Sequence, residues 1–428
     1  MFVTDPDTYY SRTSPRAPGN RLDGSFEADV CIVGGGLAGL TAALELVRGG
    51  LSVVLLEARR IAWGASGRNG GFVSAGYATS LSSIARRVGP QRAAELFRLS
   101  MEGVDIVRNN IASLGIAEAD PVPGIFKALR YESRGALQRM ADAGQRDFGL
   151  DLVHVPGRAL RDILHSPRYR EALFDAGAFH FHPVHYAQGL AREAARLGAV
   201  IGEGEPVLRV ALEGTRKSVW TQSAQVAATH VLFATGGYTG GLLPALQRAY
   251  LPIATYVLLT EAAPDLIRDA IRTRAAILDD RRAGDYYRLV EGGSRILWGG
   301  RITTRTTDPR DLAARLHREM IGTYPQLAGL RVELAWSGLM SYARHLMPQI
   351  GRASPGIWYA TAFGGHGMNT TALAGRLVAE GIAGTSERYA LFAPFDLAWN
   401  GGFMGKAAAQ LTYWGYQVAD RIREGRRE

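Results

Sequence analysis

The stretch Asp29–Glu57, DVCIVGGGLAGLTAALELVRGGLSVVLLE, decides the fold of this 428-residue chain. Val30–Val33 form a short apolar run that is typical of a buried parallel strand. Three glycines follow at G-x-G-x-x-G spacing, and Leu40–Val47 then carries helix-forming residues with an apolar face. Leu51–Leu56 is a second apolar run that ends in an acidic residue. The stretch therefore predicts a complete βαβ unit with its glycines at the strand-to-helix turn.

Each part of this unit has a role in holding the phosphates of a dinucleotide. Gly34 allows the tight turn, Gly36 lets a pyrophosphate approach the backbone, and Gly39 lets helix and strand pack closely. The helix N-terminus offers unpaired N–H groups and a positive dipole end to the phosphates. Glu57 is placed to accept hydrogen bonds from ribose hydroxyls, which an accidental glycine-rich turn would not explain. The predicted contacts are Gly34, Gly36, Leu37, Ala38, Gly39, Glu57, Ala58 and Arg59.

Length and composition favour a soluble protein of two domains. A chain of 428 residues is long for one core, and 47% hydrophobic with 21% charged residues is ordinary for a globular protein. No apolar run reaches the roughly 20 residues that span a bilayer. The first residues are polar and lack the apolar core of a signal peptide, and the single cysteine, Cys31, lies in a predicted buried strand. We expect a cytoplasmic protein without disulfides.

The net charge of +9 invites a search for anionic partners. Nearly all the basic residues are arginines, and they are scattered along the chain. No run of basic residues interleaved with aromatic residues stands out. We therefore do not expect nucleic-acid binding.

Glycine-rich stretches and short apolar runs divide the rest of the chain. Gly64–Gly71, GASGRNGG, predicts a loop in which backbone comes close to a planar ligand. Val207–Val210, Val219–Gln222 and Gln225–Ala227 predict a β-meander, and Val231–Thr235 a further buried strand. We expect a nucleotide-binding domain over 25–95, 179–245 and 345–385, a substrate domain over 96–178 and 246–344, an N-terminal arm over 1–24 and a C-terminal tail over 386–428.

The substrate domain is predicted to hold an antiparallel sheet. From Tyr250 to about Leu339 strands dominate, with one helix over Leu312–Met320. A last strand, Gly356–Phe363, precedes a glycine-rich turn and a helix over Thr370–Ile382. The predicted strands of the sheet include Ala254–Leu259, Tyr286–Leu289 and Ile296–Gly299.

Four motifs together resemble the D-amino-acid oxidase superfamily of FAD-dependent amine and amino-acid oxidases. They are the βαβ unit, SGRNGG at Ser66–Gly71, PQIGR at Pro348–Arg352 and GGHGMN at Gly364–Asn369. The branch that the chain resembles most is that of the gamma-glutamylputrescine oxidases. The resemblance implies an α/β fold, with a Rossmann-like FAD-binding domain built from discontinuous segments and a substrate domain with an antiparallel β-sheet.

The resemblance also implies roles for individual residues. The βαβ glycines would hold the FAD pyrophosphate and Glu57 the adenosine ribose, while Ser66–Gly71 would run beside the flavin. Val207 would meet the adenine through its backbone, and Gly364–Met368 would bring a helix N-terminus to the pyrimidine edge of the flavin. The further cofactor contacts implied are Gly64, Ala65, Ser66, Arg68, Asn69, Gly70, Gly71, Val207, Thr235, Gly236, Gly364, Gly365, Gly367 and Met368.

Two departures from sarcosine oxidases bear on the chemistry. Those enzymes tether FAD to a cysteine in the region that corresponds to Trp336–His345, which has none here, so we expect non-covalent FAD. They also have a lysine where this chain has Asn369. A substrate bound strongly through its carboxylate is therefore in doubt.

Aromatic and basic residues of the substrate domain are candidates for the site. His366 is expected beside the flavin, with a general-base role less favoured, because hydride transfer from a neutral amine needs no base on carbon. Of Tyr256, Tyr286, Tyr287 and Trp336, two are expected to wall an amine pocket and two to pack in the core. Arg295 or Arg301 is the candidate cation near the flavin. The predicted catalytic residues are His366, Tyr256, Tyr287, Trp336 and Arg295.

Other clusters have simpler interpretations. His180, His182 and His185 precede a predicted helix and lack a nearby cysteine or acid, so we expect a turn and no metal site. Arg288 and Arg344 could each anchor a carboxylate, but we expect most such arginines to be solvated or paired with acids.

The combined expectation is oxidation of a primary or secondary amine to an imine. Hydride passes to flavin N5, and O2 reoxidises the flavin to give H2O2. One alternative is a dehydrogenase of the same fold that passes electrons to a quinone or carrier protein. Another is an RNA-associated flavoprotein, which only the charge suggests. The exact amine and the oligomeric state stay open.

Overall fold

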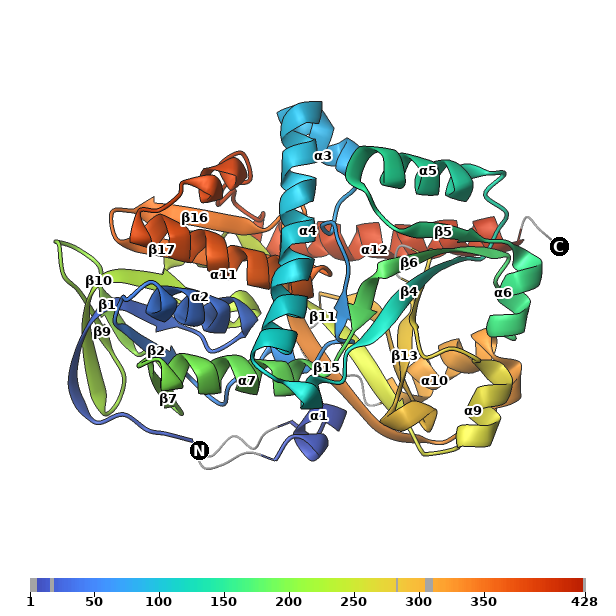
Figure 1. The fold of residues 1–428 in the computed structure, drawn as a ribbon, viewed down its shortest axis with the longest axis horizontal. Helices are drawn as coiled ribbons and strands as arrows, with labels where there is room; N and C mark the ends of the chain where they lie inside the picture. The colour runs from blue at the N-terminus through green and yellow to red at the C-terminus, as the bar shows by residue number, and fades with distance from the viewer. Residues whose placement is uncertain (1–5, 16–18, 282–283, 305–310, 426–428) are drawn as a thin grey trace.

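The computed structural model describes residues 6–15, 19–281, 284–304 and 311–425, and two β-sheets lie side by side in it (Figure 1). The first sheet has the strand order β16-β17-β10-β1-β2-β7, and the pairs along this order are parallel except for β16 with β17. These strands come from three separated stretches of the chain. They are β1 (Gly24–Val33), β2 (Val53–Glu57), β7 (Val200–Glu203), β10 (Ala224–Phe233), β16 (Gln349–Ser354) and β17 (Ile357–Thr361).

The predicted βαβ unit is confirmed as β1, α2 (Leu37–Arg48) and β2. Val30 and Ile32 pack into one core cluster with α2, whereas Cys31 and Val33 pack into another on the opposite face of the sheet. Burial on both faces explains why the strand is continuously apolar instead of alternating. The helices α7 (Pro183–Arg196) and α11 (Gly367–Ala383) pack beside α2.

The second sheet forms the other half of the molecule, and it is the predicted antiparallel sheet with one exception. Its order is β15-β11-β14-β13-β12-β4-β6-β3, and β12 with β4 is a parallel pair. The strands are β3 (Phe72–Val73), β4 (Val122–Leu129), β5 (Leu152–Val155), β6 (Glu171–His180), β11 (Tyr250–Thr260), β12 (Ala276–Asp279), β13 (Tyr286–Val290), β14 (Arg295–Thr303) and β15 (Val332–Ala343).

The long helix α4 (Pro90–Ser113) connects the two halves and packs against α11. Gly103 makes this contact possible, because a Cβ there would collide with the backbone oxygen of Asn369 in the first turn of α11. The other helices are α1 (Tyr9–Thr13), α3 (Leu81–Val88), α5 (Ala136–Phe148), α6 (Gly157–Ile163), α8 (Pro244–Gln247), α9 (Pro264–Ala270), α10 (Leu312–Thr323) and α12 (Gly402–Gly425). Over the described ranges, none of the helices combines the length and apolarity that a membrane span requires.

Two local predictions need correction. The stretches Gln225–Ala227 and Val231–Thr235 are one strand, β10, because β1 pairs with it without interruption from Gly24 to Val33 and keeps it extended. The meander is otherwise present as β8 (Arg209–Ala211) and β9 (Lys217–Trp220), so Val207 precedes its strand. The N-terminal arm contains α1, and the C-terminal tail contains the 24-residue helix α12.

Candidate functional site

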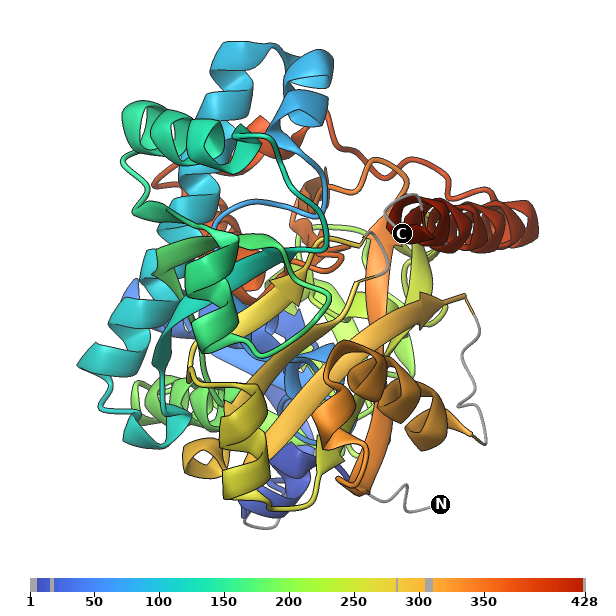
Figure 2. The same cartoon turned by 90° about the vertical axis from the view of Figure 1, so that its right-hand side faces the viewer.

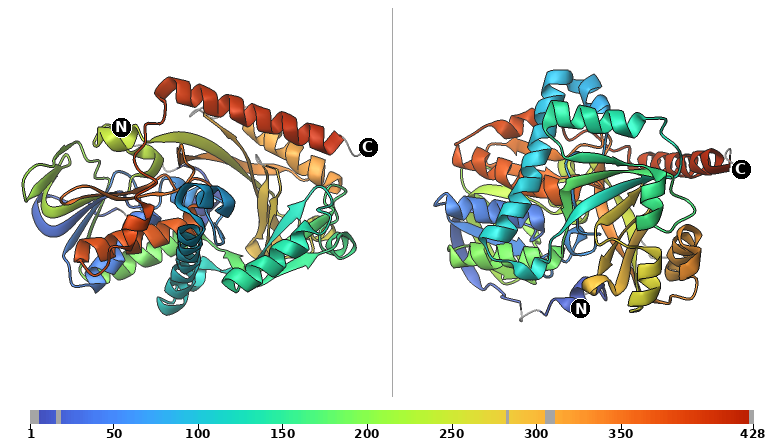
Figure 3. Two further views of the ribbon diagram at one scale, coloured as in Figure 1. Left: turned by 90° about the horizontal axis from the view of Figure 1, so that it is seen from above. Right: turned by 45° about the vertical axis from the view of Figure 1, so that its right-hand side comes forward.

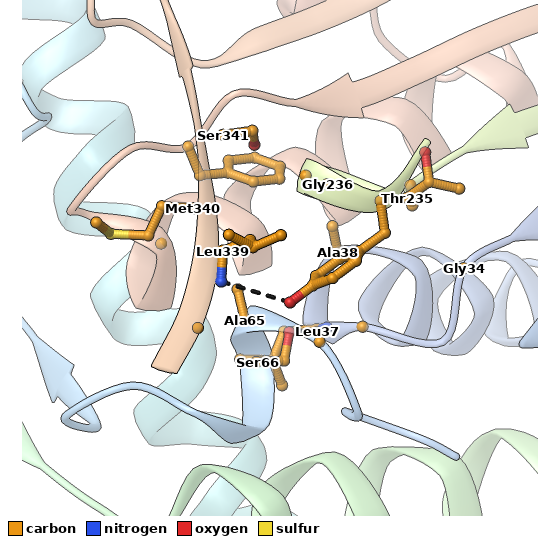
Figure 4. Close-up of a pocket in the computed structure, with 18 of the residues that line it drawn as sticks. Gly34, Leu37, Ala38, Ala65, Ser66, Thr235, Gly236, Leu339, Met340 and Ser341 are labelled. Atoms are coloured by element: carbon orange, nitrogen blue, oxygen red, sulfur yellow. Dashed lines mark hydrogen bonds between the residues drawn. The ribbon is translucent and has the colours of Figure 1, made fainter. Parts of the chain in front are cut away.

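A cavity of about 1090 Å³ lies between the carboxyl ends of β1, β2 and β10 and one face of the second sheet. In open α/β sheets, ligands bind at this end of the parallel strands. Of the residues predicted to contact the cofactor, all but Gly39 line this one cavity. Figure 4 shows its two walls, with Gly34, Leu37 and Ala38 on one side and Leu339, Met340 and Ser341 on the other.

The turn between β1 and α2 has the close packing that its glycines predict. Gly34 has a φ of +113°, and a Cβ there would lie 2.6 Å from the carbonyl oxygen of Ala234. A Cβ on Gly39 would collide with the carbonyl oxygen of Gly34, so Gly39 serves packing behind the cavity wall. Gly36 is the N-cap of α2 and no side chain caps the helix, while Ser66 Oγ accepts a hydrogen bond from the Leu37 N–H at 3.1 Å. The start of α2 therefore presents backbone N–H groups at the cavity.

Glu57 ends β2 at the cavity, and its carboxylate is held by the backbone. Oε2 accepts a hydrogen bond from the Gly35 N–H at 2.7 Å, and Oε1 accepts one from the Arg59 N–H at 2.9 Å. Burial raises the pKa of this carboxyl, which the two backbone donors oppose. Each oxygen keeps a further lone pair with which it can accept from a ligand hydroxyl.

The loop Gly64–Gly71 is fixed by its own polar groups. The Asn69 amide donates to the carbonyl oxygens of Ala65 and Ser66 at 2.8 and 2.9 Å and accepts from the Gly71 N–H at 2.7 Å. The Tyr10 hydroxyl of α1 also donates to the Asn69 carbonyl oxygen at 2.6 Å. These bonds hold the backbone of this cavity wall in one conformation.

A buried cation lies behind the same loop. The Arg288 guanidinium donates to His180 Nδ1 at 3.1 Å and to the Tyr10 hydroxyl at 3.2 Å. Burial, followed by the charge of Arg288, lowers the pKa of His180 to about 3, so the ring is neutral. Within the described ranges no carboxylate forms an ion pair with Arg288, so this residue is an exception to the expectation that most such arginines are solvated or paired with acids. The sequence singled out Arg288 only as a possible anchor for a carboxylate.

His366 lines the cavity at the start of α11, as the N-cap of that helix. Its side chain makes no capping bond, so the first turn of α11 also presents N–H groups at the cavity. Burial and then the charge of Lys127 lower the pKa of His366 to about 4, so the imidazole is neutral at pH 7. Gly364 has a φ of +58°, and a Cβ there would lie 2.9 Å from the ring of Tyr342.

Four of the five predicted catalytic residues do not line the cavity. Side chains alternate across a strand, so Tyr286 and Thr255 face the cavity while their neighbours Tyr287 and Tyr256 face the core beneath the sheet. The Tyr287 hydroxyl donates to Tyr169 at 3.0 Å within that core. The sequence prediction did not take this alternation of side chains along a strand into account.

Trp336 and Arg295 are displaced for other reasons. The Trp336 indole is buried behind the loop, where it donates to the carbonyl oxygen of Arg68 at 3.1 Å. Arg295 begins β14 and pairs with Glu291 and Glu333, whereas the cavity touches Ile302, seven residues along the same strand. The side chain of Arg301 lies outside the described residues.

Among the described residues, the wall supplied by the second sheet is aromatic and uncharged. Tyr286, Tyr342 and Thr255 line it, and the hydroxyls of Tyr286 and Thr255 lie 3.4 Å apart. Phe363 completes this side, while the charged residues of the lining come from the βαβ unit, the loop and the stretch before β9. These charged residues are Glu57, Arg59, Arg68, Glu205 and Arg209.

Asn369 is turned away from the cavity. Its amide donates to the carbonyl oxygens of Gly76 and Ser100, at 3.3 and 3.1 Å, and ties α11 to α4. Asn369, at the position where sarcosine oxidases have a lysine, thus holds two helices together here.

The three clustered histidines bond to the polypeptide. His180 Nε2 lies 2.8 Å from the Arg274 carbonyl oxygen, and His185 Nδ1 lies 2.6 Å from that of Glu118. His182 caps α7 by accepting from the His185 N–H. The predicted turn is therefore the N-terminus of α7.

A family model described as FAD dependent oxidoreductase matches residues 29–381 of the chain. The gamma-glutamylputrescine oxidoreductase of Escherichia coli is 35% identical over 391 residues, which cover 90% of this chain and 91% of that protein. A probable oxidoreductase of Haemophilus influenzae, OrdL, is 31% identical and covers 92% and 93%. Among solved structures, glycine oxidase from Geobacillus kaustophilus has a TM-score of 0.73 at 20% identity, covering 87% of this chain and 99% of that chain, and shows the same fold.

Proposed function

We propose that the chain, which belongs to the family of FAD-dependent oxidoreductases, oxidises a primary or secondary amine without a carboxylate beside the reacting carbon. The observation that supports this substrate class is the uncharged, aromatic wall of the second sheet. A carboxylate binds best to a fixed guanidinium or ammonium group, and the sheet supplies neither to the described lining. The similarity to a gamma-glutamylputrescine oxidoreductase favours an acylated diamine.

The cavity fits FAD on two counts. The cavity extends from Glu57, at the end of β2, to the loop Gly64–Gly71 and the start of α11. Two helices, α2 and α11, begin at this cavity with N-cap residues whose side chains make no capping bond. Apart from the Leu37 N–H, which donates to Ser66, their first turns offer N–H groups to anionic parts of a ligand. We assign the pyrophosphate to the start of α2 and the ribose to Glu57.

When bound, FAD supplies the hydride acceptor. We assign the N-terminus of α11 to the pyrimidine edge of the flavin, where a helix dipole favours negative charge. Arg288 adds an uncompensated positive charge behind the loop Gly64–Gly71, and it replaces Arg295 as the candidate cation. Because Cys31 is buried in β1 and does not line the cavity, we propose that FAD is held non-covalently.

The side chains of the second wall act on the amine. Tyr286, Tyr342 and Phe363 exclude water and disfavour the ammonium form, so they lower the pKa of a bound amine. His366 is neutral at the cavity and can orient the substrate as a hydrogen-bond donor or acceptor. Loss of a proton from nitrogen leaves the lone pair that hydride departure from carbon requires.

The test is an anaerobic comparison of substrates. The flavin absorbance of the purified protein should bleach faster with gamma-glutamylputrescine or another N-acylated diamine than with D-alanine or D-proline. Faster bleaching by either D-amino acid would contradict the proposed substrate class. The same protein should release its FAD into the supernatant on acid precipitation, and flavin that stays in the pellet would contradict non-covalent binding.

We propose O2 as the electron acceptor, with the quinone- or carrier-linked dehydrogenase as the alternative. Oxygen consumption and H2O2 release that keep pace with amine oxidation would support the oxidase. Anaerobic bleaching without oxygen uptake, together with reduction of a soluble quinone, would support the dehydrogenase.

A further inference from the structure

The helix α12 presents its apolar side chains to solvent. At 3.6 residues per turn, five apolar positions of α12 fall along one side of the helix, and Phe403, Leu411 and Trp414 on it are 87%, 63% and 53% exposed. Figure 2 shows α12 standing out from the body of the molecule, and Figure 3 shows it along one edge. We call this side the outer face of α12, and its members are Phe403, Leu411, Trp414, Val418 and Ile422.

A second face of α12 is attached to the second sheet through polar groups. The Tyr413 hydroxyl oxygen accepts from the Ile302 N–H at 2.7 Å, and Gln410 Oε1 accepts from the Thr303 hydroxyl at 2.9 Å. The Arg423 guanidinium lies 3.6 Å from the centre of the Tyr131 ring. A surface helix normally buries its apolar stripe and exposes its polar face, so this reversed arrangement indicates an interface.

We propose that the outer face of α12 binds the outer face of α12 in a second copy of this chain, with the two helices antiparallel. About a point between Trp414 and Gly415, close to the middle of the helix, Leu411 and Val418 of the outer face exchange places. A two-fold axis at that point places Leu411 opposite Val418 of the second copy, and Ala407 opposite Ile422. The two Trp414 side chains then meet at the axis, where Gly415 leaves room for the rings.

The described side chains of the outer face are uncharged, which favours a protein partner over an anionic lipid surface. A helix that lies on an anionic membrane carries lysines and arginines beside its apolar face. Of the α12 cations whose side chains the structure describes, Arg423 is turned to Tyr131 and Lys406 is the other. Two neighbouring apolar side chains, Trp399 and Met404, extend the patch instead.

The size of the patch suits a dimer. With roughly 100 Å² of exposed apolar surface on each large side chain, two copies would bury on the order of 1,200 Å², which is the lower end for specific protein–protein interfaces. An aromatic residue at the centre of such a patch is the usual source of its affinity, and Trp414 has that position.

Sedimentation of the flavin-loaded full chain tests the proposal. At micromolar concentration the parent should sediment at twice the 46.2 kDa mass of the chain. The double variant Leu411→Glu/Val418→Glu should raise the dimer dissociation constant on the order of a hundredfold. Met140→Glu, an equally apolar and exposed position on α5, is the matched control and should leave the dimer intact. A monomeric parent, or a double variant that stays dimeric, would overturn the proposal.

Cysteine crosslinking tests the register. Cys31 is buried, so introduced cysteines are the reactive ones. Oxidation of a mixture of Leu411→Cys and Val418→Cys variants should give a disulfide-linked dimer, whereas each variant alone should not. Self-crosslinking of each variant would overturn the antiparallel arrangement.

Two further measurements complete the test. FAD content and the rate of amine-dependent bleaching should be unchanged in the double variant, since neither substituted residue lines the cavity, and a loss of FAD would mark misfolding and move the decision to the crosslinking result. Co-sedimentation of a monomeric parent with phosphatidylserine vesicles would show a membrane as the occupant and overturn the proposed second copy.

Discussion

The two walls of the cavity differ in the groups that form them. The wall of the first sheet is mostly backbone, because glycines, a self-bonded loop and two uncapped helix starts form it. The wall of the second sheet consists of side chains such as Tyr286 and Tyr342 that project from strands. A backbone wall fixes the residue type at each position, whereas a side-chain wall tolerates many types and depends on which residues face inward.

The largest effect is expected where the backbone wall is closest packed. Gly39→Ala places a methyl group against the carbonyl oxygen of Gly34, which should destabilise the protein by about 1–3 kcal/mol and abolish FAD retention by moving the turn. Thermal unfolding and the flavin-to-protein absorbance ratio measure the two effects. Gly329→Ala is the control, because a Cβ there meets nothing within 4 Å. A Gly39→Ala protein that purifies with FAD like the parent would contradict this account of the wall.

A smaller loss is expected from Glu57, the acidic side chain at the end of β2. Glu57→Ala should weaken FAD binding about ten- to a hundredfold, in line with roughly 1.5–3 kcal/mol for a hydrogen bond to a charged group. Glu57→Asp should weaken it less, because it keeps a carboxylate that the Gly35 N–H can reach after a small shift. Titration of the apoprotein with FAD measures both. Identical affinity of the alanine variant and the parent would refute the ribose assignment.

Neighbouring tyrosines of β13 provide a matched test of the side-chain wall. Tyr287→Phe removes a hydroxyl that bonds to Tyr169 and Tyr324, and it should lower the free energy of unfolding by about 1–2 kcal/mol with little effect on catalysis. Tyr286→Phe should leave stability nearly unchanged and alter kcat/KM for the amine several-fold. Urea unfolding and steady-state kinetics distinguish the two variants, and exchanged phenotypes would mean that the inward face of β13 is assigned incorrectly.

The pH dependence of catalysis tests how the second wall affects the pKa of a bound amine. Free alkylamines have a pKa near ~10.4, and an uncharged wall should lower it on binding. Flavin bleaching at saturating amine should rise with pH and level off at an apparent pKa below that value. Because the pKa of His366 is about 4, His366→Asn should reduce the plateau but leave the apparent pKa in place. Loss of the pH dependence in this variant would make His366 the base instead.

A further effect is expected on stability in acid. The pKa of His366 is about 4 in the folded chain and about 6.5 in an unfolded one. Its contribution to stability is therefore complete above pH 6.5 and is lost as the pH falls towards 4. His366→Asn should flatten the fall in melting temperature over this range. An equally steep fall in the variant would mean that His366 is not buried in its neutral form.

Local sequence predicted the backbone wall. The spacing of Gly34, Gly36 and Gly39 and the acid at Glu57 carry their own geometry, since a tight turn, a close approach and a strand end are properties of a few adjacent residues. Of the residues predicted to contact the cofactor, only Gly39 lies behind the cavity instead of lining it. Their roles towards FAD stay predictions.

The side-chain wall could not be predicted in the same way. Tyr286 and Tyr287 are adjacent and chemically alike, and only the docking of β13 between β12 and β14 decides which one faces the cavity. Arg288 lies next along that strand, and its unpaired charge depends on Tyr10 and His180 arriving from distant parts of the chain. No local sequence pattern predicts contacts between segments that are so far apart in the chain.

The sequence by itself determined the βαβ unit, the family and the cofactor, because each is indicated by short motifs whose residues are neighbours in the chain. Only the tertiary structure decided the face of each strand that meets the cavity, the neutral state of His366, and the outward turn of the apolar side of α12. The physical reason is that burial and pairing are properties of surroundings. A residue's chemistry is fixed by its type, but its pKa, its partners and its exposure are set by segments that the fold brings to it from elsewhere.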